Sequence, residues 1–336
     1  MKQRLFGADV IRILAIYFVI VVHSTILPTQ ISPSSIINLV FFAVAKTCVP
    51  LFFMLSGGLL LTKEEPDSVF FKKRFTRLFF PWLFWTIIFL LLIIDFHSFS
   101  SAQFIASFKR SLRVFWFIPI ISVLYIATPA LRSFLKSTAK THIFTLLTIW
   151  FLLCSFLPYM RNTLAFPLSN NSVLWQTVSF SGFFVLGYLV VSKKIPLTIA
   201  HALLLSAIGL LWTIIGTFSN SSTTNLNIFY FDYFSPSLVS LSLGLFSLLW
   251  LWIPMIEGGS SEKIKKYAGN FSTATLGVYL LHTLMLQRFD SVNKTLSVFS
   301  FYKPVDSYFN GFILFTVCLL IILVLKKIKP LARFVS

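Results

Sequence analysis

The chain has 336 residues, of which 57% are hydrophobic and 11% are charged, and its formal net charge is +18. Soluble domains carry charge on about a quarter of their residues, so this composition excludes an ordinary soluble protein and indicates an integral membrane protein. The 28 basic residues do not indicate a nucleic-acid-binding protein, because most of them lie in alternate connections between apolar stretches.

Ten apolar stretches are long enough to cross a hydrocarbon core of about 30 Å as helices. We therefore expect an all-α integral membrane protein, a bundle of about ten transmembrane helices that forms one domain over residues 1–336 with no appended soluble domain. In chain order, the stretches are 8–27, 36–61, 79–97, 114–131, 143–159, 173–191, 197–217, 236–256, 270–288 and 309–325.

The distribution of basic residues predicts the topology. With a cytoplasmic N-terminus, the connections on the cytoplasmic side hold 19 Lys and Arg residues. Those on the other side hold 7, counted with Arg288 at the outer end of its stretch, while Arg12 and Lys46 lie within stretches. Cytoplasmic connections are enriched in Lys and Arg. We expect a multi-pass protein of the cell membrane, inner or plasma, with both termini in the cytoplasm and the lipid bilayer as its solvent.

The first stretch carries Asp9, Arg12 and His23. Arg12 and His23 lie on one stripe of a helix, about 16 Å apart along its axis, because eleven residues come within about 20° of three full turns. Ionisable residues at membrane depth are functional-site candidates by default. Asp9 precedes Arg12 by three positions, a spacing that allows an ion pair on the helix surface. The alternative for His23 is a histidine that is solvated or satisfied by the core.

The second stretch carries Lys46 in its outer half and then Ser56-Gly57-Gly58. Small residues let membrane helices approach closely, which is one interpretation of the glycines. In the other, Pro50 and the glycines break the helix and leave room for a ligand, since irregular backbone is tolerated beside a wet cavity. The predicted topology places Ser56 far from His23, which argues against Ser56 as a nucleophile.

Four elements share the outer depth, namely His23, Lys46, Arg113 with Trp116, and His282. Arg113 and Trp116 have a simpler interpretation as interfacial residues, because aromatic belts and snorkelling cations are common there. The three cysteines lie in apolar stretches without paired spacing, so the sequence indicates neither a disulfide nor a metal site.

Several short strings occur in order along the chain. They are Asp9-x-x-Arg12 with His23, Val49 to Gly57, Lys73-Arg74-Phe75-x-Arg77-Leu78-x-x-Pro81, Phe115-Trp116-Phe117 with Tyr125 and Pro129, and Leu276-Gly277-x-Tyr279-Leu280-x-His282. No single string is decisive, whereas the ordered set over about 290 residues is specific. Taken together, the strings resemble the membrane-bound acyltransferase-3 superfamily, and in particular its stand-alone polysaccharide O-acetyltransferases.

The resemblance implies transfer of an acyl group from cytoplasmic acyl-CoA, here acetyl-CoA with no metal, to a hydroxyl of a cell-surface or lipid-linked glycan. It places Arg74, Arg77, Arg12 and Lys46 on the donor, because guanidinium groups bind phosphates through paired hydrogen bonds. Lys72-Lys73-Arg74 has an alternative role as a topology signal or a contact for anionic lipids. Arg113, Trp116 and Tyr125 are expected on the acceptor, and Asp9, Ser56 and Gly57 are expected to support the site.

His23, with Arg12 and His282, is the expected catalytic group. Imidazole has a pKa near 6.5 and can take the proton of a sugar hydroxyl, or it can accept the acyl group itself. The sequence leaves both mechanisms open. His282 is expected as a second proton carrier or an acceptor contact, with a structural role as the alternative. The competing class is a carrier or flippase for a lipid-linked sugar or small molecule.

Overall fold

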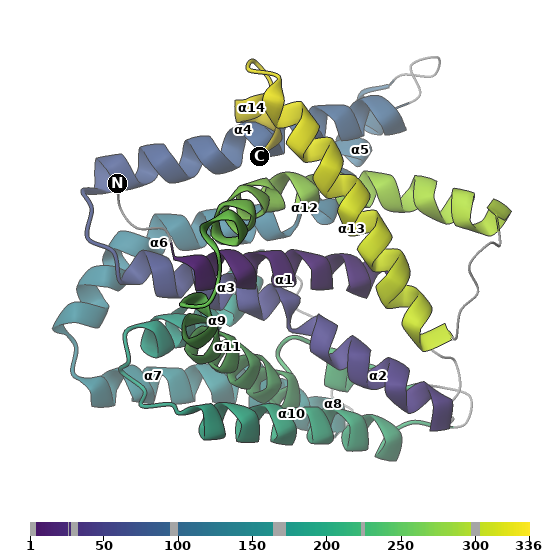
Figure 1. Cartoon of the computed structure of the whole chain (residues 1–336). Coiled ribbons are helices and arrows are strands. Elements are labelled where there is room, and N and C mark those ends of the chain that lie inside the picture. The colour runs from purple at the N-terminus through teal and green to yellow at the C-terminus, as the bar shows by residue number, and fades with distance from the viewer. Residues whose placement is uncertain are drawn as a thin grey trace.

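The chain folds into a bundle of helices in the computed structural model (Figure 1). The structure describes residues 5–25, 27, 33–94, 100–163, 173–222, 226–296 and 303–336, and every regular element within these residues is helical. The all-α class is therefore confirmed. α1, α4 and α10 lie nearly parallel in Figure 1, whereas α13 runs obliquely to them.

The elements are α1 (Phe6–Ser24), α2 (Pro33–Lys46), α3 (Cys48–Leu61), α4 (Asp67–Ile93), α5 (Ser101–Val114), α6 (Phe117–Ser137), α7 (Lys140–Phe151), the π-helical turn η2 (Leu152–Phe156), α8 (Leu157–Thr163), α9 (Val173–Val191), α10 (Ile199–Ser219), the 3₁₀ turn η3 (Phe229–Phe231), α11 (Pro236–Glu257), α12 (Glu262–Leu296), α13 (Lys303–Lys327) and α14 (Ala332–Val335).

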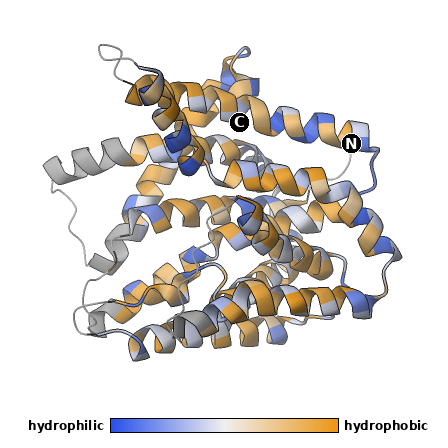
Figure 2. Cartoon of the chain, turned by 180° about the vertical axis from the view of Figure 1, so that it is seen from behind, coloured by the Kyte–Doolittle hydropathy of each residue, from blue (hydrophilic) through white to orange (hydrophobic). Residues whose placement is uncertain are grey.

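Nine helical segments in the described part of the chain are long and apolar enough to cross a membrane, and each overlaps one of the ten expected stretches. The remaining stretch, 270–288, lies inside α12, which extends beyond it at both ends. The expected ends of two stretches, at residues 26 and 95–97, lie outside the described residues. Hydrophobic residues cover most of the length of the helices in Figure 2, as contact with lipid requires.

The second apolar stretch is divided into two helices at Thr47, between α2 and α3. Pro50 has no N–H to donate to the carbonyl of Lys46, four residues earlier, so the helical hydrogen-bond ladder is interrupted there. Thr47 turns back and donates its N–H and its hydroxyl to the carbonyl of Val44, at 3.2 and 2.7 Å. Lys46 thus ends α2, where the negative end of the helix dipole favours a cation.

Gly57 and Gly58 lie inside the continuous helix α3, so the prediction that they break it is wrong. Both pack against α9. A Cβ on Gly57 would overlap the carbonyl of Phe184, and a Cβ on Gly187 would overlap the backbone of Met54. The alternative prediction, close approach of two helices through small residues, is confirmed.

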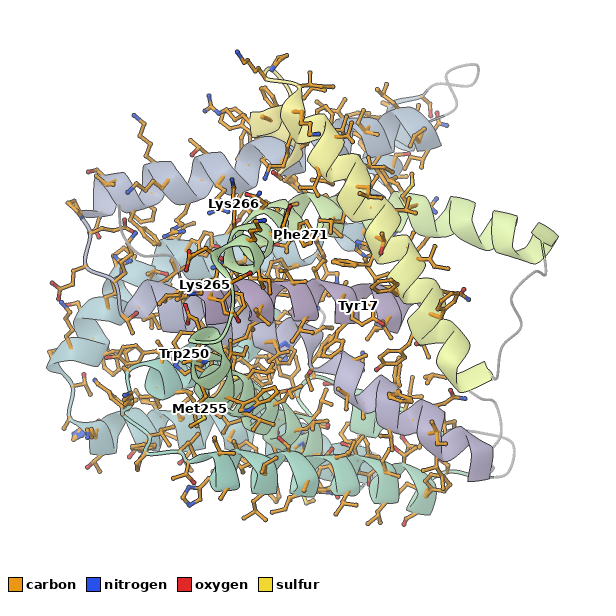
Figure 3. The ribbon with its side chains drawn as sticks, viewed as in Figure 1. Tyr17, Trp250, Met255, Lys265, Lys266 and Phe271 are labelled. Atoms are coloured by element: carbon orange, nitrogen blue, oxygen red, sulfur yellow. The ribbon has the colours of Figure 1, made fainter. Side chains whose placement is uncertain are left out.

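α1 lies between several helices, since it contacts α2, α3, α11, α12 and α13. The ring of Tyr17 faces α13 (Figure 3), where it stands edge-on to Tyr308, Phe312 and Phe315 at centroid distances of 6.2, 6.4 and 5.9 Å. Its hydroxyl donates to the carbonyl of Tyr308 at 3.1 Å. These contacts fix the rotation of α1 and therefore the direction in which Arg12 and His23 point.

α5 is a helix that the apolar stretches did not predict. Ser100 caps it, because the Ser100 hydroxyl accepts the N–H of Gln103 at 3.2 Å. At the other end, the N–H of Phe115 donates to the carbonyl of Ser111 at 2.9 Å, and α6 begins at Phe117 rather than at residue 114. A search for apolar stretches does not find α5 because the helix carries several charged residues. Ser100, a residue type common at helix N-caps, was the sequence signal for its start.

We expect Gly57→Ala to destabilise the protein, because the added methyl group has no space between α3 and α9. Overpacking of this kind costs about 1–3 kcal/mol. A lower melting temperature in detergent would show it. Gly258→Ala is the matched control, because nothing lies within 4 Å of a Cβ at that position. Equal melting temperatures for the two variants would contradict the close approach of α3 and α9.

Candidate functional site

A cavity of about 880 Å³ lies between α1, α3, α4, α6 and α12. Arg12 and His23 of α1 both line it, and about 16 Å of helix separates their backbones. The helical stripe predicted for this pair therefore forms one wall of the cavity. The cavity extends along α1 from the depth of Arg12 to the depth of His23.

Twelve residues were predicted from the sequence for the site, and eight of them line this cavity. These are Arg12, His23, Lys46, Ser56, Arg74, Arg77, Trp116 and Tyr125. Asp9, Gly57, Arg113 and His282 are not among the lining residues. Asp9 contacts Arg12, and the His282 ring lies next to the His23 ring, so each of these two lies beside a lining residue.

Arg12 is held by two groups at the cavity wall. Its guanidinium donates to Asp9 Oδ1 and to the Ser272 hydroxyl of α12, each at 3.3 Å. Asp9 is buried, so the ion pair that the three-residue spacing allows is present and gives this carboxylate a partner. The hydrogen bond from Arg12 to Ser272 joins α1 to α12 at the same depth.

Cationic side chains gather at one end of the cavity, which we call the basic end. Arg12, Lys63, Arg74 and Arg77 line it. Glu64 lines the same region, and its carboxylate pairs with Lys136. The balance of charge at the basic end is therefore positive.

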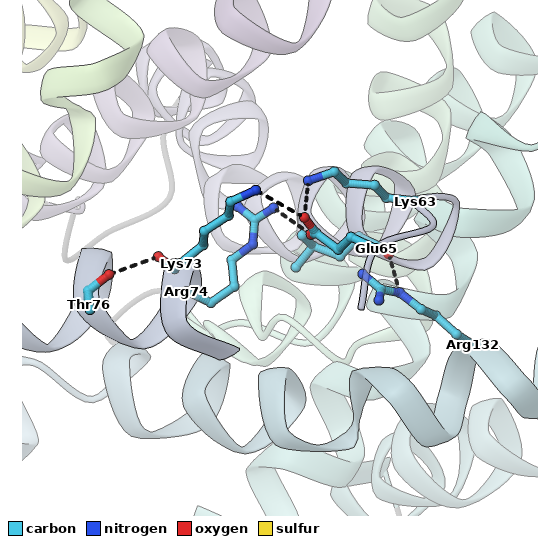
Figure 4. Close-up of polar contacts among 7 residues, drawn as sticks. Lys63, Glu65, Lys73, Arg74, Thr76 and Arg132 are labelled. Carbon is cyan, nitrogen blue, oxygen red and sulfur yellow. Dashed lines mark hydrogen bonds and ion pairs between the residues drawn. The ribbon is translucent and has the colours of Figure 1, made fainter. Parts of the chain in front are cut away.

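Glu65 holds part of this cluster together (Figure 4). Its carboxylate lies 2.6 Å from Lys63 Nζ and 3.6 Å from both Lys73 Nζ and Arg74 Nη2. Burial raises the pKa of Glu65, but the hydrogen bond from Lys63 and the charges of Lys63, Arg74 and Lys73 together outweigh burial and leave that pKa below its usual value. Glu65 is thus an ionised group shared by three cations.

Arg132 fixes the end of α3 beside the same cluster. Its Nε donates to the carbonyl of Leu60 at 2.8 Å, which gives a partner to one of the last carbonyls of α3 (Figure 4). The guanidinium lies 4.6 Å from the ring centroid of Phe70, a cation–π contact. Arg132 therefore ties α6 to α3 and α4 where the basic end begins.

The opposite end of the cavity, which we call the histidine end, is formed by His23, Lys46, Trp116 and Tyr233. Lys46 Nζ lies over the Tyr233 ring, 4.3 Å from its centroid. The charge of Lys46 also acts on His23. The structure therefore places Lys46 beside His23 and apart from Arg74 and Arg77, with which it was predicted to share the donor.

His282 is buried directly behind His23, with 5.4 Å between the two ring centroids. His282 Nδ1 is hydrogen-bonded to the carbonyl of Tyr279. A carbonyl only accepts, so Nδ1 carries the proton and Nε2 is an acceptor. Within the described residues, Nε2 has no hydrogen-bond partner. A buried acceptor nitrogen therefore lies next to the ring of His23.

The three residues predicted for the acceptor lie in three different places. Trp116 is at the histidine end, where it stacks on Phe180 with 5.6 Å between centroids. Tyr125 lines the cavity near the charges of Arg74, Arg77 and Arg12. Arg113 is exposed on α5 and outside the cavity lining.

Lys63, Tyr233 and Tyr279 are among the cavity-lining residues that were not predicted for the site. Lys63 could have been found, because it belongs to the basic connection that follows the second stretch. Tyr279 lies within one of the strings that carried the family resemblance. Tyr233 gave no signal, because it sits among several aromatic residues before α11.

The model of the acyltransferase-3 family, described as an acyltransferase domain, matches residues 5–325. The chain belongs to this acyltransferase family. No curated protein and no solved structure matches the chain significantly. The match includes the residues that line the cavity, which makes the cavity the candidate active site of a multi-pass membrane acyltransferase.

We expect Glu65→Gln to lower the melting temperature of the acyltransferase at pH 7. A lowered folded-state pKa means that ionised Glu65 stabilises the fold above the unfolded-state pKa of about 4.3, and that this contribution is lost as the pH falls through the folded-state pKa. The difference in melting temperature between wild type and Glu65→Gln should therefore shrink below about pH 4, which melting curves in detergent will show.

Glu262→Gln is the matched control, because Glu262 forms an exposed pair with Lys265 at 3.1 Å. Such pairs contribute little to stability. A difference in melting temperature between wild type and Glu65→Gln that stays constant from pH 7 to about pH 3 would contradict the role of ionised Glu65.

Proposed function

We propose that this acyltransferase moves an acetyl group from cytoplasmic acetyl-CoA to a hydroxyl of a cell-surface or lipid-linked glycan, with His23 at the reacting centre. One observation carries the proposal. A single cavity connects the basic end, with Arg12, Arg74 and Arg77, to the histidine end, with His23. A long donor with phosphates at one terminus and a thioester at the other fits such a cavity.

The donor's phosphates are proposed to bind at the basic end. Arg74 and Arg77 are one turn apart on α4, so both guanidinium groups can approach clustered phosphates with paired hydrogen bonds. Lys63 adds a third cation from the connection between α3 and α4. The distribution of basic residues supports a cytoplasmic location for this end of the bundle.

The pantetheine arm then extends along α1, past Arg12 and Ser56, and brings the thioester to His23. In the first mechanism, His23 takes the proton of the acceptor hydroxyl as its oxygen attacks the thioester carbonyl. The carbon–sulfur bond breaks, and the leaving thiolate takes the proton from the imidazolium. In the second, the unprotonated ring nitrogen of His23 attacks the thioester carbonyl, the carbon–sulfur bond breaks, and the thiolate of CoA takes the proton from the other ring nitrogen of His23. The acceptor hydroxyl then attacks acyl-histidine, its oxygen takes the acyl group, and its proton returns to the imidazole.

His282 is proposed as a positioning residue for His23. Its Nδ1 proton is held by the carbonyl of Tyr279, which leaves Nε2 as an acceptor for a ring N–H of His23. A hydrogen bond of this kind would select one tautomer of His23 and leave the other ring nitrogen free to act on the substrate. Both mechanisms require such a nitrogen.

Acetyl-CoA should raise the melting temperature of the purified protein, because a ligand that binds only the folded state stabilises it. Arg74→Gln and Arg77→Gln should each weaken this binding by about tenfold, as expected for loss of one charge-assisted contact. Lys266→Gln, near the start of α12 (Figure 3), is an exposed control that should leave binding unchanged. No stabilisation by acetyl-CoA or CoA would favour the carrier function instead.

Cells that lack the protein should lose one acetyl modification from their surface or lipid-linked glycans, and His23→Ala should reproduce that loss. Mass spectrometry of the glycans measures it, with membrane levels of each variant checked. Asn270→Ala, an exposed position on α12 that is not among the lining residues, serves as the expression-matched control. Acetylation retained by His23→Ala would remove His23 from the reaction, and an unchanged pattern in the deletion would remove glycan acetylation.

A further inference from the structure

α5 carries a strip of three exposed cations, Lys109, Arg110 and Arg113. Arg113 is three positions from Arg110 and four from Lys109, so the side chains are neighbours within an arc of about 100°. α5 contains no acidic residue, and within the described residues these cations form no ion pair. This strip is therefore a concentrated positive charge on the surface of the protein.

The same helix carries an exposed apolar strip. Phe104 and Ile105 are 43% and 52% exposed, and Phe104 stacks on Phe108 with 6.4 Å between centroids. Ser107 and Ser111 form the buried side of α5. A basic strip and an apolar strip on one helix are typical of helices that lie at a membrane interface.

α5 is attached to the wall of the cavity at its histidine end. Phe115, which follows α5, is fully buried and packs edge-on against Phe89 of α4 at 5.8 Å. The next residue, Trp116, lines the cavity. Arg113, the last cation of the strip, thus precedes Trp116 at the histidine end by three residues. The basic end lies at the other end of the cavity, where α4 begins beside Glu65.

We propose that α5 binds the phosphate of a lipid-linked acceptor. Lys109, Arg110 and Arg113 contact the phosphate, the apolar strip contacts the lipid chain, and the attached sugar reaches the cavity past Trp116. Charge complementarity selects this occupant over an uncharged glycan, and attachment to the cavity wall selects it over a lipid of the bulk leaflet. The inference rests on the proposed function and narrows its acceptor to a glycan carried on a lipid phosphate.

Binding of three probes to the purified full-length protein tests this directly, with native mass spectrometry as the readout. The probes are polyprenyl phosphate, the uncharged polyprenol of the same chain length, and phosphatidylglycerol. Wild type should bind polyprenyl phosphate most tightly. Lys109→Gln/Arg110→Gln/Arg113→Gln should weaken that binding by about 10- to 100-fold, since each cation near a membrane surface contributes on the order of 1 kcal/mol toward an anionic lipid.

The matched control is Lys140→Gln/Lys263→Gln/Lys266→Gln, which removes three exposed cations near the starts of α7 and α12. It changes the net charge by the same amount and should leave polyprenyl phosphate binding unchanged. Unchanged affinity in the α5 variant would overturn the proposal. So would equal affinity of wild type for phosphatidylglycerol, which would make α5 a contact for bulk anionic lipid.

Two measurements separate this proposal from the proposed function. The α5 variant should keep the stabilisation by acetyl-CoA, because its substitutions lie outside the cavity lining. If the triple variant does not fold, the single variants Lys109→Gln and Arg110→Gln should each weaken polyprenyl phosphate binding by about fivefold. The binding assay contains no donor, so a failure of acetyl transfer in cells would overturn the proposed function and leave this result standing.

Discussion

An arginine inside a membrane protein must have a partner, and the rest of the site depends on how Arg12 meets this requirement. Asp9 supplies the opposite charge from one turn earlier on α1, and Ser272 supplies a second acceptor from α12. The three groups together fix α1 against α12 and keep a cation at the cavity wall. Because His23 lies on the same helical stripe, the orientation that satisfies Arg12 also turns His23 into the cavity.

The sequence predicted those parts of the molecule that depend on local pattern. The lengths of the apolar stretches predicted the membrane-spanning helices. The spacing of Arg12 and His23 predicted that both side chains lie on one stripe of a helix, which forms one wall of the cavity. The sequence did not predict α5, because a short helix with three cations has no apolar stretch. It predicted the depth that Lys46 shares with His23, but not the division of the second stretch at Thr47, which follows from the loss of one hydrogen bond at Pro50. Tyr233 reaches the site through tertiary contacts with Lys46 and Trp116, which no local pattern encodes.

The basic end attracts anions, yet several of its cations already pair with carboxylates when no ligand is bound. Lys63 and Arg74 share Glu65, and Arg12 has Asp9, so part of the positive charge is balanced before any substrate binds. An anionic ligand must therefore compete with these carboxylates, which lowers affinity and favours release of product. In the proposed function, such moderate binding would let the spent donor leave the site after each turnover.

The contact between α3 and α9 limits how the size of the cavity can change over evolutionary time. Backbone meets backbone at Gly57 and Gly187, so α3 has no freedom to move toward α9 and widen the space on its other face. Phe52 projects from α3 into the cavity, and Phe117 faces it from α6 with 6.0 Å between the rings. A change in the volume of the cavity would therefore come from substitutions of lining side chains such as Phe52 and Phe117 rather than from displacement of α3.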